Sequence, residues 1–215
     1  MIITHLGLEA FKIQFGDTVI ALNPISKESK HKGTRFGADI ALVSLNDKDF
    51  NGIETVTHGD RAPFAITGPG EYEIKGIFIK GFKSESHYGL PAGSKETRIN
   101  TIYTISLEGM NLCFLGAIDS KTLSVETNEA IDDIDVLFVP IGGDGVLTPA
   151  QASELAVALE PKLIIPMHWS NDEKNLKAFL KESGEEGSKA EEKLTLKKKD
   201  LEGKEGEVAV LAPQV

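Results

Sequence analysis

The sequence has almost no cysteine, since Cys113 is the only one among 215 residues. A single thiol excludes an intramolecular disulfide, and we interpret Cys113 as a small apolar residue within a strand. Chains without disulfides are typical of reducing compartments. The segment after Met1 has no basic flank and no long apolar core, so no secretory signal is visible. We therefore expect a cytoplasmic protein.

Long apolar runs and excess positive charge are also missing. No run approaches the roughly 18 apolar residues that a membrane span requires, so we expect no membrane partner. Lysine and arginine number 23 against 33 aspartates and glutamates, which gives a net charge of −10. Binding to a phosphate backbone needs concentrated positive charge. The only basic cluster, residues 197–199, precedes Asp200 and is typical of a solvated turn, so we expect no nucleic-acid partner.

What the chain does have suits one globular domain, which we assign to residues 1–215. Its length is sufficient to bury a sizeable core, and 40% hydrophobic and 26% charged residues are ordinary values for a soluble domain. Short β-rich runs predict strands in the first part of the chain, at residues 2–6, 10–15, 18–22, 40–43, 53–57, 63–66, 72–82, 100–107 and 111–115. Polar, aperiodic residues 83–99 predict a long loop, either a lid or a disordered flap.

Helix signals appear only late in the chain. Thr148-Pro149-Ala150-Gln151 predicts a capped helix that Pro161 ends, and residues 170–173 offer a second capping box for a helix closed by Gly184. Further strands are predicted at residues 135–140, 162–167 and 207–211, with a charged linker at 182–192. Early strands followed by strand–helix pairs predict a layered α/β sandwich.

Chemistry is expected just after the strand predicted at residues 40–43, where the sequence continues Ser44-Leu45-Asn46-Asp47-Lys48-Asp49-Phe50. Ligands of open α/β sheets gather beyond the carboxyl ends of strands. Asp47 and Asp49 place two carboxylates there. Segments of the Asn-Asp-x-Asp type also form plain solvated turns, and that is the alternative interpretation.

This loop resembles that of the metallo-β-lactamase superfamily, in particular the small zinc-dependent hydrolases related to ascorbate-phosphate lactonases. The resemblance extends over roughly residues 1–170, in the order of the family. It is carried by Thr4-His5-Leu6-Gly7, Gly68-Pro69-Gly70-Glu71-Tyr72-Glu73, Asn100-Thr101-Ile102-Tyr103, Val139-Pro140-Ile141-Gly142-Gly143 and Ile165-Pro166-Met167-His168. The resemblance implies a four-layer αββα sandwich.

The ligands of the family are largely replaced here. Its loop reads Ser/Thr-His-x-His-x-Asp-His, so its three histidines fall on Leu45, Asp47 and Phe50, and its aspartate on Asp49. The later Gly-Asp element of the family aligns with Gly116-Ala117, and Asp119 comes two residues later. The family also has a histidine after the first Leu-Gly, where this chain has Leu8, and often an aspartate before the first proline, where it has Asn23-Pro24.

Four side chains remain as candidates for a residual cleft: Asp47, Asp49, His87 and His168. Either Ser86 or His87 would occupy the middle-loop ligand position of the family. His168 has an alternative interpretation as a partly buried histidine hydrogen-bonded beneath Trp169. A catalytic zinc site needs about three protein ligands, and Leu45, Phe50 and Ala117 cannot supply any.

These residues predict a metallo-β-lactamase-like protein that has lost the metal-dependent hydrolase site, holds no cofactor and binds a small molecule or a protein in its cleft. They identify no catalytic residue. The alternative is an active hydrolase of an ester, lactone or phosphoester, the reaction types that the resemblance implies. That enzyme would use one weakly bound divalent ion, Zn²⁺ or Mn²⁺, at Asp47, Asp49 and His168. Other enzyme classes lack support, because the sequence contains neither a Gly-x-Ser-x-Gly elbow nor a phosphate-binding Gly-x-x-x-x-Gly-Lys loop.

Overall fold

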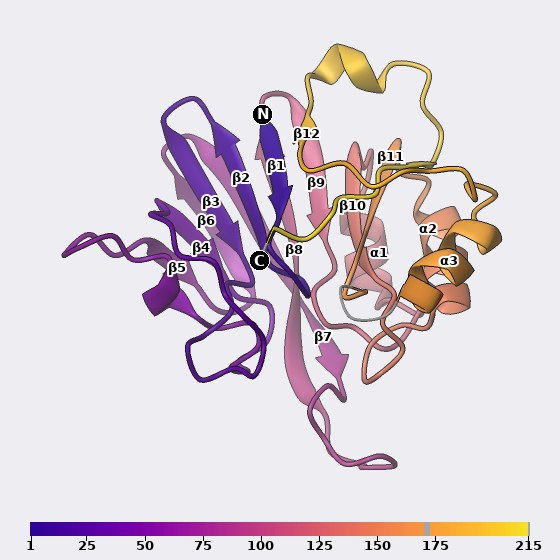
Figure 1. Cartoon of the computed structure of the whole chain (residues 1–215), viewed down its shortest axis with the longest axis horizontal. Helices are drawn as coiled ribbons and strands as arrows, with labels where there is room; N and C mark the ends of the chain where they lie inside the picture. The colour runs from indigo at the N-terminus through magenta and orange to yellow at the C-terminus, as the bar shows by residue number, and fades with distance from the viewer. Residues whose placement is uncertain (170–172, 215) are drawn as a thin grey trace.

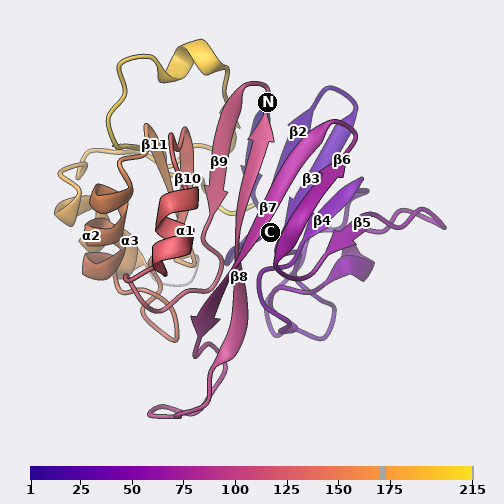
Figure 2. The ribbon, with the colours of Figure 1, turned by 180° about the vertical axis from the view of Figure 1, so that it is seen from behind.

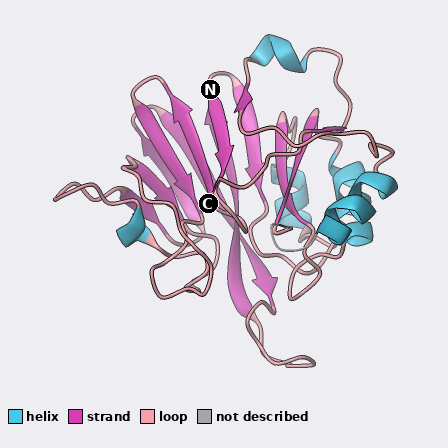
Figure 3. Cartoon of the chain, in the orientation of Figure 1, coloured by secondary structure: helices cyan, strands magenta, loops and turns pink. Residues whose placement is uncertain are grey.

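The computed structural model describes residues 1–169 and 173–214, which fold into two facing β-sheets with α-helices on one side (Figures 1 and 3). The first sheet has the strand order β12-β1-β2-β3-β4-β5 and the second has the order β13-β11-β10-β9-β8-β7-β6. The strands of the first sheet are β1 (Ile2–His5), β2 (Phe11–Phe15), β3 (Thr18–Leu22), β4 (Ile40–Leu42), β5 (Phe64–Ile66) and β12 (Leu194–Thr195). Those of the second are β6 (Gly70–Ile74), β7 (Ile77–Ser86), β8 (Arg98–Leu107), β9 (Met110–Phe114), β10 (Val136–Pro140), β11 (Leu163–Met167) and β13 (Glu207–Val208).

The main core lies between the inner faces of the two sheets. In β2, Phe11 and Ile13 are buried while the alternating Lys12 and Gln14 are half-exposed, as expected of a strand with one covered face. Strands β10 and β11 are buried along their whole length, because the first sheet covers one side of them and helices cover the other. Continuous apolar runs in the sequence therefore mark the centre of the second sheet.

Three helices pack on the outer face of the second sheet: α1 (Val125–Ala130), α2 (Pro149–Leu159) and α3 (Glu173–Glu182) (Figure 2). Ala152, Leu155 and Phe179 bury this face. The outer face of the first sheet is covered by loop residues such as Phe36 and by residues around the 3-10 turn η1 (Ile53–Thr55). A second 3-10 turn, η2 (Lys198–Leu201), lies near the C-terminus. The predicted α/β sandwich is confirmed, with loop and turn as the layer over the first sheet.

The capping box of α2 is confirmed. The Thr148 hydroxyl accepts a hydrogen bond from the Gln151 amide at 3.3 Å, and the Gln151 side chain accepts one from the Thr148 amide at 3.0 Å. The second predicted box includes residues 170–172, which lie outside the described residues. Among the described helices none is long and apolar enough to cross a membrane.

Three element predictions were wrong. The segment predicted as a strand at residues 53–57 contains the 3-10 turn η1 at Ile53–Thr55 instead, because the hydroxyls of Thr55 and Thr57 donate to the carbonyls of Gly52 and Ile53. The strand predicted at 72–82 is instead the hairpin β6–β7, which turns at Lys75-Gly76 with φ of 53° and 74°. The loop predicted at residues 83–99 covers only residues 87–97, because β7 and β8 extend into the predicted range. Helix α1 was not predicted from the sequence.

Candidate functional site

The candidate site lies where parallel strands of both sheets end. In the first sheet β4 runs parallel to β3 and β5, and in the second β9, β10 and β11 run parallel to one another. The segment after β4 meets the second sheet, since the Thr101 amide donates to the Ser44 carbonyl at 2.8 Å. The segments that follow β4, β9 and β11 therefore meet at the edge of the molecule where the carboxyl ends of these strands lie.

Buried polar side chains from β8 fix these segments. The Asn100 side chain accepts from the Ala117 amide at 3.0 Å and donates to the Leu115 carbonyl at 2.9 Å. The Tyr103 hydroxyl donates toward the carbonyls of Val43, at 2.9 Å, and Ile66, at 3.2 Å. The Asn100-Thr101-Ile102-Tyr103 motif therefore holds the backbone of the site in place.

The positions that would carry metal ligands are filled by buried apolar side chains. Leu45, Phe50 and Ala117 are 2%, 0% and 0% exposed and belong to one hydrophobic cluster. The other buried members of that cluster are Leu6, Leu8, Ala10, Ile25 and Val146. Burying one large apolar side chain contributes about 1.5–3 kcal/mol, so these residues stabilise the fold at the place where ligands would cost stability.

Asp49 is buried and its carboxylate is occupied. The hydroxyls of Ser29 and Tyr88 donate to its two oxygens at 2.5 Å and 2.8 Å. Burial alone would raise the pKa of Asp49, but these two hydrogen bonds hold it below the usual value. Burial and the hydrogen bond to Asp49 raise the pKa of Tyr88. The solvated-turn interpretation was therefore wrong for Asp49, which is an ionised acceptor inside the molecule.

The Asp47 carboxylate is held by Arg98, the first residue of β8. The carboxylate accepts from Arg98 at 2.7 Å, and the same guanidinium donates to the carbonyls of Tyr88, at 2.9 Å, and Asn46, at 2.6 Å. Arg98 thus joins the loop after β4 to the loop after β7. Asp47 also accepts from the Asp49 amide at 3.1 Å, which forms a local turn.

His168 is held by a carboxylate that sequence reasoning missed. Its Nδ1 lies 2.8 Å from Glu9, whose side chain is fully buried, and Asn23 donates to the other Glu9 oxygen at 2.9 Å. Asn23 in turn holds Ser44 through two hydrogen bonds of 2.8 Å. The partner of His168 is thus Glu9, while the Trp169 indole donates to the Pro166 carbonyl.

Backbone strain gathers around Glu9. Leu8, Asn23 and His168 adopt left-handed conformations with φ of 46°, 41° and 63°. Such conformations are uncommon outside glycine and persist where the surroundings impose them. Here the His168 amide donates to the Leu8 carbonyl at 2.7 Å, so one hydrogen bond joins two of these left-handed residues.

His87 lines a cleft together with Asp47 and Asp49, but its hydrogen-bond partner is Asp119 and not another of the four candidates. Its Nδ1 and its amide lie 2.5 Å and 3.2 Å from Asp119, and the pair is partly exposed. Ser86, the other candidate for the middle-loop position, is buried and accepts from the Tyr88 amide at 3.1 Å. The loop after β7 therefore contributes Tyr88 to the site, because its ring lies 4.8 Å from that of Phe50 and 5.4 Å from that of His168.

The donor set does not fit the zinc that the family resemblance implies. Among residues 1–169 and 173–214, no group of three or more His, Cys, Asp or Glu side chains could hold a metal ion. Asp49 and His168 are both present, but the Tyr88 side chain contacts each of them. About three ligands and an open position would be needed for a catalytic ion.

An open cleft of about 850 Å³ adjoins this filled region. Its wall includes Asp47, Asp49, His87 and Tyr88, together with loop residues 89–94 and 143–145 and the lysines Lys30 and Lys48. Gly145 lets the loops approach, since a Cβ there would lie 3.0 Å from the Tyr88 Cα. The volume is in the usual range for small-molecule sites.

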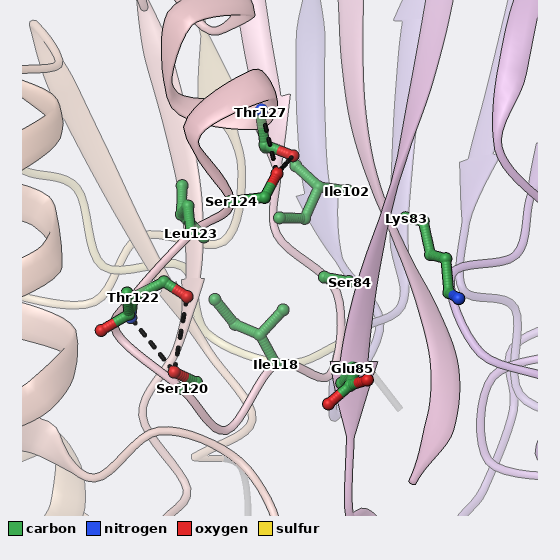
Figure 4. Close-up of a pocket in the computed structure, with 10 residues that line it drawn as sticks. All are labelled: Lys83, Ser84, Glu85, Ile102, Ile118, Ser120, Thr122, Leu123, Ser124 and Thr127. Carbon is green, nitrogen blue, oxygen red and sulfur yellow. Dashed lines mark hydrogen bonds between the residues drawn. The ribbon is translucent and has the colours of Figure 1, made fainter.

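A smaller pocket of about 370 Å³ lies between β7, β8 and the segment leading into α1 (Figure 4). Ser120, Ser124 and Thr127 line it, but their hydroxyls are engaged with one another or with Thr122. The three hydroxyls of this pocket are thus engaged within the protein.

Comparison of the sequence with known protein families identifies the family of this chain. Residues 2–168 match the model of the β-lactamase superfamily domain. The chain belongs to the β-lactamase superfamily. The fold and the motif order predicted from the sequence are thereby confirmed for most of the chain.

Relatives place this superfamily member beside proteins described as metal-dependent hydrolases. A Listeria innocua protein named as a UPF0173 metal-dependent hydrolase is 25% identical over 198 residues, covering 79% of this chain and 86% of that protein. A Thermotoga maritima structure, described as a candidate Zn-dependent hydrolase of the metallo-β-lactamase superfamily, superposes with a TM-score of 0.76 at 27% identity, over 99% of both chains. A Parabacteroides distasonis structure shares the fold, with a TM-score of 0.67 at 16% identity over 99% and 93% of the two chains.

Sequence reasoning missed three residues of this β-lactamase superfamily site: Glu9, Tyr88 and Arg98. Glu9 directly follows Leu8, one of the positions where the chain departs from the family, but no local pattern marks it as buried. Tyr88 gave a weak signal, because it is an aromatic residue in an otherwise polar stretch. Arg98 was assigned to the loop, and its contacts depend on β8 beginning there.

Proposed function

We propose that this chain keeps the metallo-β-lactamase fold without the metal of the family and functions by binding a ligand in the cleft beside Tyr88. One observation carries the proposal: Leu45, Phe50 and Ala117, at the positions of three ligands, are packed in a single buried apolar cluster. Supplying ligands there would require the core of the site to be rebuilt.

The engagement of the remaining carboxylates supports the same proposal. Asp49 accepts two hydroxyl hydrogen bonds, and Asp47 pairs with Arg98. Both carboxylates act as anchors for the loop after β7. The ligand that we propose is a small molecule, because the cleft is concave and the walls come from four separate loops.

One observation favours the alternative, a hydrolase with a reduced metal site. Histidines that bind metals usually donate a hydrogen bond from the N–H of the other ring nitrogen, often to a carboxylate. Glu9 orients His168 through a contact of this kind. Asp47, Asp49 and His168 would have to share a single ion, which requires Tyr88 and Arg98 to release both aspartates. We therefore favour the binding protein.

Thermal unfolding in the presence of metal tests the proposal. We expect little change in Tm on adding micromolar Zn²⁺ or Mn²⁺ to the full chain, because stabilisation grows only as RT ln(1 + [L]/Kd) and a weak site contributes little. The matched control is His168→Ala. A large increase in Tm at micromolar metal that His168→Ala abolishes would support the hydrolase instead.

A further inference from the structure

Tyr88 occupies the candidate site in the manner of a bound ligand. Its ring lies beside Phe50 at 4.8 Å and edge-on to His168 at 5.4 Å, and its hydroxyl donates to Asp49 at 2.8 Å. These are the apolar contacts and the one oriented polar contact that a small-molecule site typically provides. We propose that Tyr88 is an internal occupant, and that a ligand carrying a hydroxyaryl group displaces it and takes its place.

The buried carboxylate determines the chemical class of this ligand. Asp49 is 5% exposed, and one of its oxygens accepts only the Tyr88 hydroxyl among the described residues. When Tyr88 leaves, that oxygen needs another donor, since a buried unsatisfied acceptor is costly. A phenol supplies the donor, whereas a carboxylate or phosphate would be repelled by Asp49 and a plain aryl group would leave it unsatisfied.

Tyr88 is also placed where it can be exchanged. It belongs to the loop 87–97, which has Gly89 and Gly93 in left-handed conformations and mostly exposed residues after Leu90. Arg98 holds this loop through Asp47 and through the Tyr88 carbonyl, at a partly exposed position. Figure 1 shows the β7–β8 hairpin extending away from the body of the molecule. The loop 87–97 can therefore move while the paired strands β7 and β8, which carry Ile79, Tyr103 and Ile105 of the core between the sheets, stay in place.

The open cleft receives the rest of the ligand. It begins at Tyr88 and Asp49 and has a volume of about 850 Å³. Its rim carries both signs of charge, on Lys30, Lys48 and Asp144. Asp49, at the buried end of the cleft, therefore selects ligands with a phenol group, while the rim of the cleft accepts polar substituents of the ligand.

Binding of 4-methylphenol to the full chain tests this inference, with toluene as the matched probe that lacks the hydroxyl. We expect Tyr88→Ala to bind 4-methylphenol at least about tenfold more tightly than toluene, because only the phenol satisfies Asp49. We also expect at least about tenfold tighter binding than to the unmodified chain, in which Tyr88 competes at high effective concentration. Tyr72→Ala, which removes a tyrosine on β6, should behave like the unmodified chain. Equal affinity for the two probes, or equal affinity of Tyr88→Ala and the unmodified chain, would overturn the inference.

A second measurement covers the case in which Tyr88→Ala does not fold. In the unmodified chain, saturating 4-methylphenol should shift the NMR signals of the His168 ring, identified by their loss in His168→Gln, and leave those of His58 in place. Unmoved His168 signals would overturn the inference. The inference rests on the proposed function, yet zinc content and phenol binding are measured separately, so either can fail alone.

Discussion

Phe50 stands at a position where the family resemblance implies a metal ligand, and it is part of a buried apolar cluster. Its side chain is fully buried and packs against the rings of Tyr88 and His168. A histidine there would place polar nitrogens in an apolar cluster, where an unpaired polar group is unfavourable. The buried environment of residue 50 therefore favours the apolar phenylalanine side chain over a histidine.

We expect Phe50→His to lower the free energy of unfolding by about 3 kcal/mol, near the lower end of the range for removing a buried phenylalanine. The matched control is Lys48→His in the same loop, where the side chain is exposed and the change should remain within about 0.5 kcal/mol. Denaturant unfolding measures both values. Similar stability of Phe50→His and the wild type would mean that the loop after β4 is packed less tightly than described here.

At the residue scale, the apolar residues at the expected ligand positions were easier to predict than the polar contacts around them. The apolar character of Leu45, Phe50 and Ala117 is visible by direct reading. The pairing of His168 with Glu9 is not, because it joins residues 159 positions apart through two left-handed backbone turns. Long-range pairings of this kind depend on the folded topology, which a single sequence does not specify.

At the scale of elements, the strongest local signals gave the right result. The helix α2 was predicted from its capping box and its proline boundary, and the central strands β10 and β11 from their apolar runs. Predictions failed where turn chemistry governs the backbone. Lys75-Gly76 reverses the chain within an otherwise continuous β-rich run, and Thr55 and Thr57 stabilise η1.

A charged cluster joins several elements at the other end of the second sheet. Asp135, just before β10, is fully buried and accepts from Lys162 at 2.8 Å, from Lys198 at 2.7 Å and from the Asn111 amide at 2.8 Å. Burial alone would raise the pKa of Asp135, but the hydrogen bonds from Lys162 and Lys198 outweigh it, and the pKa is lowered. The cluster therefore ties β9, β10, β11 and η2 together through one ionised carboxylate.

The lowered pKa of Asp135 fixes the sign of a pH effect. A carboxyl group whose pKa is lower in the folded than in the unfolded chain, where it is about 3.9, stabilises the fold fully above that value. This contribution is lost as the pH falls through the folded pKa. We expect Asp135→Asn to lower the free energy of unfolding by about 2 kcal/mol at pH 7, with a difference from the wild type that shrinks below about pH 4.

Denaturant titrations at several pH values measure this difference, with the exposed Asp60→Asn as the control that should show little change. A difference that stays constant from pH 7 down to pH 3 would show that Asp135 contributes through packing and not through its charge.

At the scale of the whole molecule, the scaffold is that of the superfamily, while the side chains at the candidate site are mostly apolar. The two sheets, the converging strand ends and the motif order are those of the β-lactamase superfamily. At the convergence, apolar packing and a tyrosine from the β7–β8 loop fill the space where ligands would be needed. The fold thus surrounds a cleft of about 850 Å³ beside this packed region.

Metal content tests this account most directly. The full chain, purified without chelator and analysed by inductively coupled plasma mass spectrometry, should contain substantially less than one equivalent of zinc. Three expected ligand positions are apolar, and Asp47 and Asp49 are engaged with Arg98 and Tyr88. One equivalent of tightly bound zinc, retained through dialysis and lost in His168→Ala, would contradict the account.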